Sequence, residues 1–248
     1  MKVKSILISQ PPPTTESSPY LELSKNQQVK IDFRPFIEVK EVSANNVRKQ
    51  KIDFSDFTAV IFTSKNAVDH YFRLSEDMRY KVPDDMKYVC QSEAIAYYLQ
   101  KYVVYRKRKI YVGEKDFKDV LSLIKKHRQE RFLLPSSDVL KPEVPRMLTK
   151  LNVYWKRAIL YKTVSIDLSD LKDFSYDILV FFSPAGIKSL FENFPNFEQN
   201  RVKIATFGKS TLDAASKAGL KIAIRVPTPK IPSMAMALEK YLRDEGFF

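Results

Sequence analysis

The chain has 248 residues, of which 44% are hydrophobic, so it can form one large or two modest domains with cores of their own. Its net charge of +13 favours anionic ligands but does not select among nucleic acid, anionic lipid and a polycarboxylate metabolite. The one cysteine, Cys90, excludes an intrachain disulfide and a cysteine-based metal cluster, and it fits a reducing cytoplasm. Two histidines, His70 and His127, leave little for metal binding, and we expect a surface or packing role for His70.

The N-terminal segment predicts a strand, a helix and a second strand. The first strand covers residues 4–9 and stops at three prolines, which cannot continue a central strand. Ser18 and Pro19 predict the start of a helix through about Asn26, and the alternating residues 29–36 predict the second strand. No apolar run near the start is long enough for a signal peptide, and none in the chain reaches the roughly 20 residues of a membrane span.

The central stretch is DFTAVIFTSKNAVDHYF, residues 56–72. An apolar, β-rich run ends at Thr63 and Ser64, and the apolar residues that follow have helical spacing. In a parallel sheet such a turn lies at the carboxyl end of a strand, where hydroxyls and free helix N–H groups can hold an anion. The remaining pattern of this region predicts strands 59–63, 87–91, 110–112, 132–134 and 158–164, a turn at 135–137, and helices 66–74, 93–101, 116–128 and 143–151.

A second copy of the central stretch occurs at residues 175–191, SYDILVFFSPAGIKSLF. It aligns Ser183 with Ser64 and Phe181 with Phe62. The elements predicted around it are strands 178–182, 203–207 and 222–225, a turn at 227–229, and helices 185–193, 210–218 and 233–243. Internal repetition on this scale indicates two similar domains.

The second copy lacks one strand and helix at its end, and the first 36 residues resemble the missing piece. We therefore expect an α/β fold with two similar domains, each a parallel sheet flanked by helices. The domains are residues 1–36 with 168–248, which is discontinuous, and the inserted residues 43–161; residues 37–42 and 162–167 form a two-stranded β ladder between them. The turns at the carboxyl ends of both sheets would then face one cleft.

Two function classes besides catalysis stay open on these residues. The basic run 106–109 has Tyr102, Tyr105 and Tyr111 around it, and interleaved aromatics can stack on bases in a nucleic-acid-binding module; the alternative is a solvated entrance to a strand. A non-catalytic two-domain protein that closes on a small polyanion would share the cleft.

The order of six segments resembles the uroporphyrinogen-III synthase family over nearly the full length. They are IFTSKNAV, LLPSSDVLKPEVPRML, LYKT at residues 160–163, VFFSPAGIKSLF, IATFGKSTLDAASKAGL and VPTPKIPSMAMAL. The resemblance implies a cofactor-free, cytoplasmic, monomeric hydro-lyase of tetrapyrrole (porphyrin and haem) biosynthesis, with no membrane or nucleic-acid partner. A transient contact with the preceding deaminase is left open.

The resemblance also implies the reaction. The substrate is hydroxymethylbilane, a linear tetrapyrrole with carboxylate side chains, which loses its terminal hydroxyl to give an azafulvene cation. The substituted carbon of ring D attacks to give a spiro intermediate, which fragments and recloses with ring D inverted, so that water is lost overall. Without an enzyme the bilane closes to the symmetric I isomer, and the catalyst must therefore mainly hold ring D in the productive pose.

The resemblance assigns site residues where the motifs match. Tyr161 in LYKT is the expected proton donor to the leaving hydroxyl, with a packing role as the alternative. The expected substrate-binding residues are Thr63, Ser64, Asn66, Ser92, Ser136, Ser183, Pro184, Gly208, Ser210 and Thr211. Helix N-capping is the alternative for the hydroxyl side chains. Ile95 stands where the family tends to have a threonine, so one hydroxyl of that loop is lost, and Ser92 is the candidate to replace it.

Overall fold

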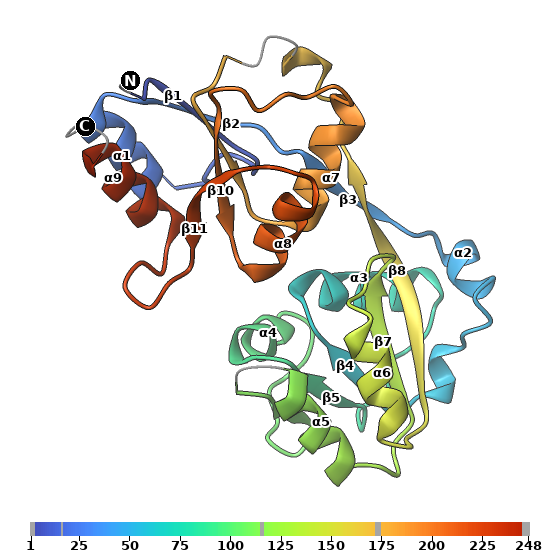
Figure 1. Cartoon of the computed structure of the whole chain (residues 1–248). Helices are drawn as coiled ribbons and strands as arrows, with labels where there is room; N and C mark the ends of the chain where they lie inside the picture. The colour runs from blue at the N-terminus through green and yellow to red at the C-terminus, as the bar shows by residue number, and fades with distance from the viewer. Residues whose placement is uncertain (1–2, 16, 115–116, 172–174, 245–248) are drawn as a thin grey trace. The chain divides into compact units, whose positions relative to one another are not determined.

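The computed structural model describes residues 3–15, 17–114, 117–171 and 175–244 (Figure 1). The chain divides into two units, Met1–Glu38 with Val164–Phe248, and Val39–Thr163. It passes between them twice, within strands β3 (Ile37–Glu41) and β8 (Trp155–Ser165), which are hydrogen-bonded neighbours. The two segments expected to form a ladder, 37–42 and 162–167, overlap these two strands, which are neighbours in one sheet.

The first unit contains a five-stranded sheet in the order β11-β10-β9-β1-β2, with every neighbouring pair parallel. Its strands are β1 (Ser5–Ile8), β2 (Lys30–Phe33), β9 (Ile178–Phe181), β10 (Lys203–Phe207) and β11 (Ile222–Val226). Because β1 pairs with both β2 and β9, the N-terminal segment completes a sheet whose other strands come from the end of the chain.

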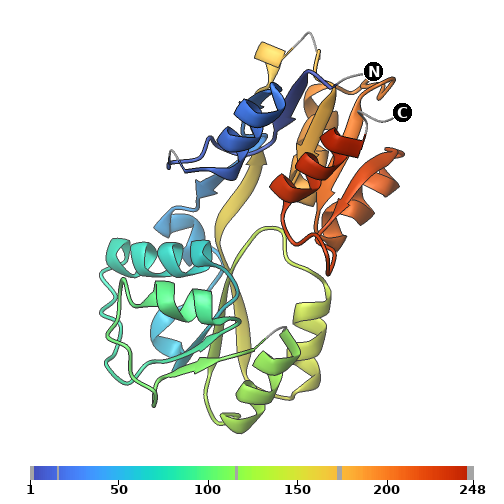
Figure 2. The same cartoon turned by 90° about the vertical axis from the view of Figure 1, so that its left-hand side faces the viewer.

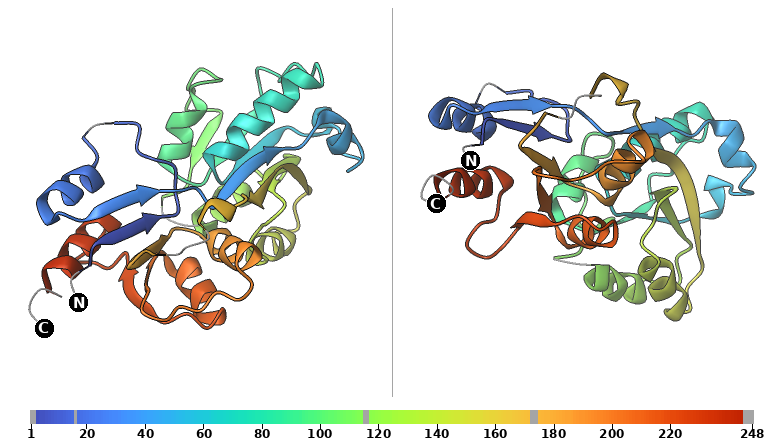
Figure 3. Two further views of the ribbon diagram at one scale, coloured as in Figure 1. Left: turned by 90° about the horizontal axis from the view of Figure 1, so that it is seen from above. Right: turned by 45° about the horizontal axis from the view of Figure 1, so that its top comes forward.

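Helices cover both faces of this sheet. Helices α1 (Pro19–Gln27) and α9 (Met234–Asp244) lie side by side on one face, close to where the described chain begins and ends (Figures 1 and 3). Helices α7 (Pro184–Asn193) and α8 (Lys209–Lys217) pack on the other face. The continuous apolar strands are therefore buried on both sides, as parallel sheets require.

The second unit contains a six-stranded sheet in the order β3-β8-β7-β4-β5-β6. Its further strands are β4 (Ala59–Phe62), β5 (Lys87–Cys90), β6 (Ile110–Val112) and β7 (Phe132–Ser137). The parallel part, β8-β7-β4-β5-β6, has the same order as β2-β1-β9-β10-β11 in the first unit when the two repeats are superposed in sequence. The duplication seen in the sequence is therefore a duplication of topology, to which the second unit adds β3.

Two pairs of helices cover the sheet of the second unit. Helices α3 (Lys65–Asp77) and α4 (Glu93–Leu99) lie on one side, and α5 (Phe117–Lys126) and α6 (Glu143–Lys150) on the other (Figure 2). Helix α3 forms because its buried residues Ala67, Val68, Tyr71 and Leu74 recur on one face. No helix in the described part of the chain is long and apolar enough to cross a membrane.

Several expected elements differ from the structure. The turn at 135–137 is wrong, because β7 continues through Ser137. Pro135 is tolerated there since the paired register of β7 with β4 ends at Leu133, so its missing N–H removes no bond to that neighbour. In place of the strand expected over 29–36 the structure has the shorter β2 (Lys30–Phe33). In place of the strand expected over 158–164 it has the longer β8 (Trp155–Ser165). The helix expected over 116–128 begins at a residue outside the described ones; its described part ends at Lys126.

The residues just after β3 form an element that the sequence patterns did not predict. It is the short helix α2 (Ala44–Arg48), where the hydroxyl of Ser43 accepts from the N–H of Asn46. A helix of five residues is too short to show apolar periodicity, so only its N-cap could have indicated it.

Candidate active site

Ser64 lies in the turn of the central strand-turn-helix of the second unit, between β4 and α3, and has two partners. It is the N-cap residue of α3, and its Oγ accepts a hydrogen bond from the N–H of Ala67 at 3.1 Å. The same Oγ lies 3.0 Å from the hydroxyl oxygen of Tyr161. Ser64 therefore caps the helix and contacts the expected proton donor at once.

Tyr161 comes from β8, yet its hydroxyl reaches the start of α3. The residue is only 7% exposed, and burial raises the pKa of its phenol, while hydrogen bonds with Ser64 and the Ser137 backbone oppose that shift. The net effect keeps the phenol protonated at neutral pH. If Ser64 donates to the phenol oxygen, the phenol proton is free for a ligand, which is the state that a general acid needs.

One face of the Tyr161 ring is covered by His70 of α3. The ring centroids are 4.9 Å apart and the ring planes differ by 17°. His70 is itself buried, and its Nδ1 accepts a hydrogen bond from Nε of Arg73 at 3.4 Å. Sequence reasoning gave His70 only a surface or packing role, because the contact depends on a strand that lies far away in the chain.

Ser136 is buried and its hydroxyl is already engaged. It donates to the carbonyl of Ser137 at 3.0 Å and accepts from Nε of Arg157 at 2.8 Å. Arg157 also donates to the carbonyls of Ser137 and Asp138. The structure thus places Ser136 at the carboxyl end of β7, within a network that shapes the backbone beside Tyr161.

A pocket of about 530 Å³ lies at the carboxyl ends of β4 and β5. Thr63 and Gln91, which follow the two strands directly, line it, together with Lys118 and Lys141. Two ammonium groups, a hydroxyl and an amide are suitable partners for carboxylates, and they outnumber the one carboxylate of the lining, that of Glu143. Sequence reasoning missed Gln91, although its position at the end of a strand could have indicated it.

The other expected residues of the second unit lie beside this edge of the sheet. Asn66 is exposed in the first turn of α3, and Ser92 precedes α4 without making a side-chain capping bond, so its hydroxyl is not used by the helix. Ile95 is 7% exposed and belongs to the apolar core. Its position accommodates an apolar side chain. Ser92 is therefore the residue of this loop that could supply the hydroxyl that a threonine at position 95 would provide.

Ser183 begins the corresponding helix of the first unit. It is the N-cap of α7, and its Oγ accepts from the N–H of Gly186 at 3.2 Å, as Ser64 does for α3. Pro184 is the first helical residue and is exposed. Ser9, at the end of β1, lies close enough that its Oγ would be 3.8 Å from a Cβ built on Gly186, so a second hydroxyl joins this turn.

Helix α8 begins without a side-chain cap. Gly208 is its N-cap residue, with φ +86°, and nothing lies within 4 Å of where its Cβ would be. Ser210 is exposed in the first turn, whereas Thr211 is buried. The Oγ1 atoms of Thr211 and of Thr206 in β10 have no hydrogen-bond partner among the described residues. Open helix N–H groups beside a buried, unpartnered hydroxyl favour an anionic ligand.

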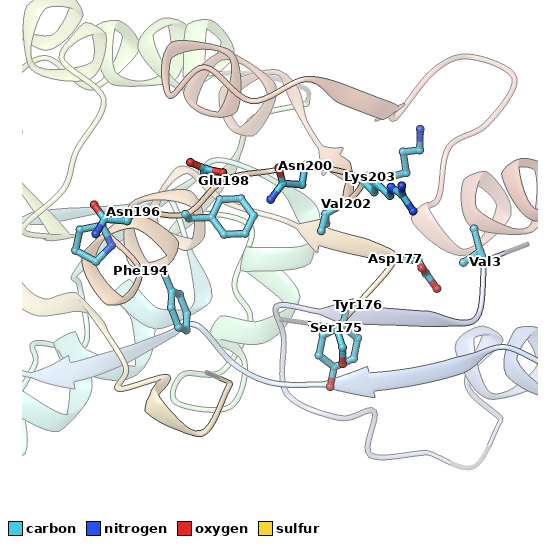
Figure 4. Close-up of a pocket in the computed structure, with 13 residues that line it drawn as sticks. Val3, Ser175, Tyr176, Asp177, Phe194, Asn196, Glu198, Asn200, Val202 and Lys203 are labelled. Carbon is cyan, nitrogen blue, oxygen red and sulfur yellow. The ribbon is translucent and has the colours of Figure 1, made fainter. Parts of the chain in front are cut away.

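A larger pocket, about 1500 Å³, lies elsewhere, at the amino ends of strands in the first unit (Figure 4). Two of its polar lining residues, Asp177 and Tyr176, have structural partners. Asp177 accepts from the N–H groups of Lys4 and Ser5, and the Tyr176 hydroxyl donates to Asp32. Parallel sheets bind ligands at the opposite, carboxyl ends of their strands, so size alone does not make this pocket the active site.

The sequence profile described as "Uroporphyrinogen-III synthase HemD" matches residues 18–236, which is most of the chain. The chain belongs to the uroporphyrinogen-III synthase family. No curated protein sequence matches it, so the family profile and the fold carry the comparison.

Two solved structures show that the fold is also that of the uroporphyrinogen-III synthase family. A mutant uroporphyrinogen III synthase from Thermus thermophilus has a TM-score of 0.63 at 15% identity, and the match covers 98% of this chain and 99% of the Thermus chain. The uroporphyrinogen-III synthetase from Helicobacter pylori has a TM-score of 0.63 at 18% identity, and the match covers 97% of this chain and 99% of the Helicobacter chain. At such low identity the likeness establishes the α/β fold with parallel sheets.

Proposed function

We propose that this chain converts hydroxymethylbilane to uroporphyrinogen III, with Tyr161 as the group that protonates the leaving hydroxyl. The proton from the phenol and the departing hydroxyl together make water, and the azafulvene cation that remains closes through the spiro intermediate with ring D inverted. The observation that carries this assignment is the Tyr161 hydroxyl, 3.0 Å from Ser64 and protonated at neutral pH. A proton returns to the phenolate when the product loses one on reclosure.

The substrate's carboxylates need cationic and N–H donors, and each unit supplies its own. In the second unit Thr63, Gln91, Lys118 and Lys141 line the pocket at the strand ends. In the first unit the uncapped start of α8 is the strongest candidate, because it combines free N–H groups with a buried hydroxyl. The other hydroxyl and amide residues named above are proposed to bind substrate at the same edges.

Holding the substrate is the main task, because the bilane closes without help to the wrong isomer. A catalyst of this kind needs groups that orient ring D and one proton donor, and neither a nucleophile nor a base of unusual strength. We also propose that the enzyme acts as a monomer in the cytoplasm, as the family resemblance implies.

The deciding experiment is an isomer assay. Hydroxymethylbilane is generated in situ, the protein is added, and the oxidised products are separated into uroporphyrins I and III by chromatography. We expect a dominant III isomer, and a lower rate for Tyr161→Phe without unfolding of the protein. If only the I isomer forms, at the rate seen without protein, the proposed function is wrong. If III forms equally fast with Tyr161→Phe, only the role of Tyr161 is wrong.

A further inference from the structure

A row of side chains runs from the end of β3 through α3 to Tyr161. Arg73 lies in its middle: its guanidinium donates to the Asp77 carboxylate at 2.7 Å and to the carbonyl of Val42 at 3.0 Å, and it lies 3.4 Å from the Glu41 carboxylate. These contacts come from α3 itself and from the strand end beside it. Arg73 is therefore held from two elements while its Nε points at His70.

His70 is fixed in turn by Arg73. Because Nδ1 accepts the bond from Arg73, the neutral imidazole carries its proton on Nε2. Burial, and then the charge of Arg73, lower the pKa of His70, while Glu41 and Asp69 oppose this shift more weakly. A neutral, oriented ring thus lies against Tyr161, and its buried position and engaged Nδ1 make it a poor proton carrier for a ligand.

We propose that His70 is a positioning residue, which holds the Tyr161 ring in the orientation where its hydroxyl meets Ser64. The argument is geometric and rests on the proposed function of Tyr161. A tyrosine side chain has two rotatable bonds, and the Ser64 hydrogen bond fixes only the position of its far end. The flat contact with His70, at 17° between ring planes, removes the remaining rotation about the long axis of the phenol.

The consequence for catalysis concerns turnover more than affinity. His70 is 9% exposed and reaches the reaction only through the Tyr161 ring. Loss of that contact lets the phenol sample orientations in which its proton does not point at the leaving hydroxyl. Misplacement of a catalytic group by a small angle lowers the rate and leaves the binding of distant carboxylates unchanged.

The test is a double-mutant cycle between His70 and Tyr161. We expect His70→Ala to lower kcat about tenfold with KM nearly unchanged, and His70→Phe, which keeps a flat ring, to restore most of the rate. In a Tyr161→Phe background His70→Ala should have no further effect, because His70 acts only through the tyrosine hydroxyl. An equal loss in both backgrounds overturns the proposal and leaves the synthase assignment intact.

The chain offers a matched control in its other histidine. His127 packs against Tyr111 in the same unit, with centroids 4.1 Å apart and an angle of 39°. His127→Ala removes a contact of the same kind away from Ser64 and should leave kcat unchanged. If His127→Ala lowers kcat as much as His70→Ala, the loss reflects general destabilisation of the unit, and the proposal is wrong.

A second measurement does not depend on activity. With ring-labelled tyrosine, nuclear magnetic resonance follows the flipping of the Tyr161 ring, which is assigned from the Tyr161→Phe spectrum. We expect slow flips in the natural protein and in His70→Phe, and fast flips in His70→Ala. Unchanged flipping in His70→Ala overturns the positioning role even if the protein makes no uroporphyrinogen III at all.

Discussion

Replacing Ser64 by alanine should destabilise the second unit more than a helix cap alone explains. The Oγ of Ser64 accepts from Ala67 N–H at 3.1 Å and contacts the Tyr161 hydroxyl at 3.0 Å. Loss of an N-cap costs about 1 kcal/mol, and loss of a buried hydrogen bond costs about 1 kcal/mol more. The Ser64→Ala variant is therefore expected to lose about 2 kcal/mol of unfolding free energy, the sum of the two.

Two other serines at helix N-cap positions make matched controls. Ser183 caps α7 with the same extended backbone conformation and has no hydrogen bond to a tyrosine among the described residues, so Ser183→Ala should cost about 1 kcal/mol. Ser92 makes no side-chain capping bond, so Ser92→Ala should stay within about 0.5 kcal/mol of the natural protein. The three serines thus separate the cap from the tyrosine contact.

Amide hydrogen exchange is the suitable assay, because it reports each helix start separately even if the two units unfold independently. The N–H groups of Ala67 and Gly186 are the direct reporters for Ser64 and Ser183. In a Tyr161→Phe background the excess cost of Ser64→Ala should disappear. If Ser64→Ala costs no more than Ser183→Ala, the Ser64–Tyr161 hydrogen bond contributes nothing to stability, and the reasoning about this contact fails.

Two further predictions concern the start of α8. Thr211→Val removes a buried hydroxyl that has no partner among the described residues, so stability should be unchanged or rise by up to about 1 kcal/mol; KM for the bilane should rise about tenfold if the hydroxyl binds a carboxylate. Thr206→Val is the control, since it should match the stability effect without changing KM. Gly208→Ala should cost about 1 kcal/mol through its positive φ alone and weaken substrate binding. Gly219→Ala, with φ +80° and equally open space, should cost the same stability and leave KM unchanged, and equal KM values for the two alanine variants would contradict an anion site at Gly208.

The repeat made the architecture predictable. Ser64 and Ser183 align in sequence, and both cap a helix that follows a buried central strand. Once two copies were aligned, the missing strand of the second copy pointed to the N-terminal segment, and β1 does lie beside β9. The sequence pattern failed at Pro135, where a proline predicted a turn but the strand β7 continues. The strand accommodates the proline because its pairing with β4 has already ended at Leu133.

The side-chain contacts of the candidate site residues could not be predicted from the sequence. Tyr161 and Ser64 were each expected from motifs, but nothing in the sequence indicates that the tyrosine reaches across β7 to the start of α3. A packing role was expected for His70, but not its contact with Tyr161, and Arg157 could not be linked to Ser136 without the pairing of β7 with β8. Side-chain partners on neighbouring strands depend on register and rotamer, which neither composition nor periodicity contains.

The two units use the same topology but differ in how their helix starts are occupied. In the two aligned strand-turn-helix copies, Ser64 caps α3 and Ser183 caps α7 by accepting from a helix N–H group. Ser64 also contacts the hydroxyl of Tyr161. The corresponding serine of the first unit, Ser183, has only its capping bond among the described residues, so the proposed proton donor has no counterpart there. The next helix of the first unit, α8, keeps its N–H groups open beside the buried Thr211 hydroxyl. An unsatisfied buried hydroxyl costs stability, and a carboxylate would remove that cost, whereas the capped α7 has no such need. We therefore expect the first unit to bind an anion at the start of α8, and the second unit to transfer the proton from Tyr161.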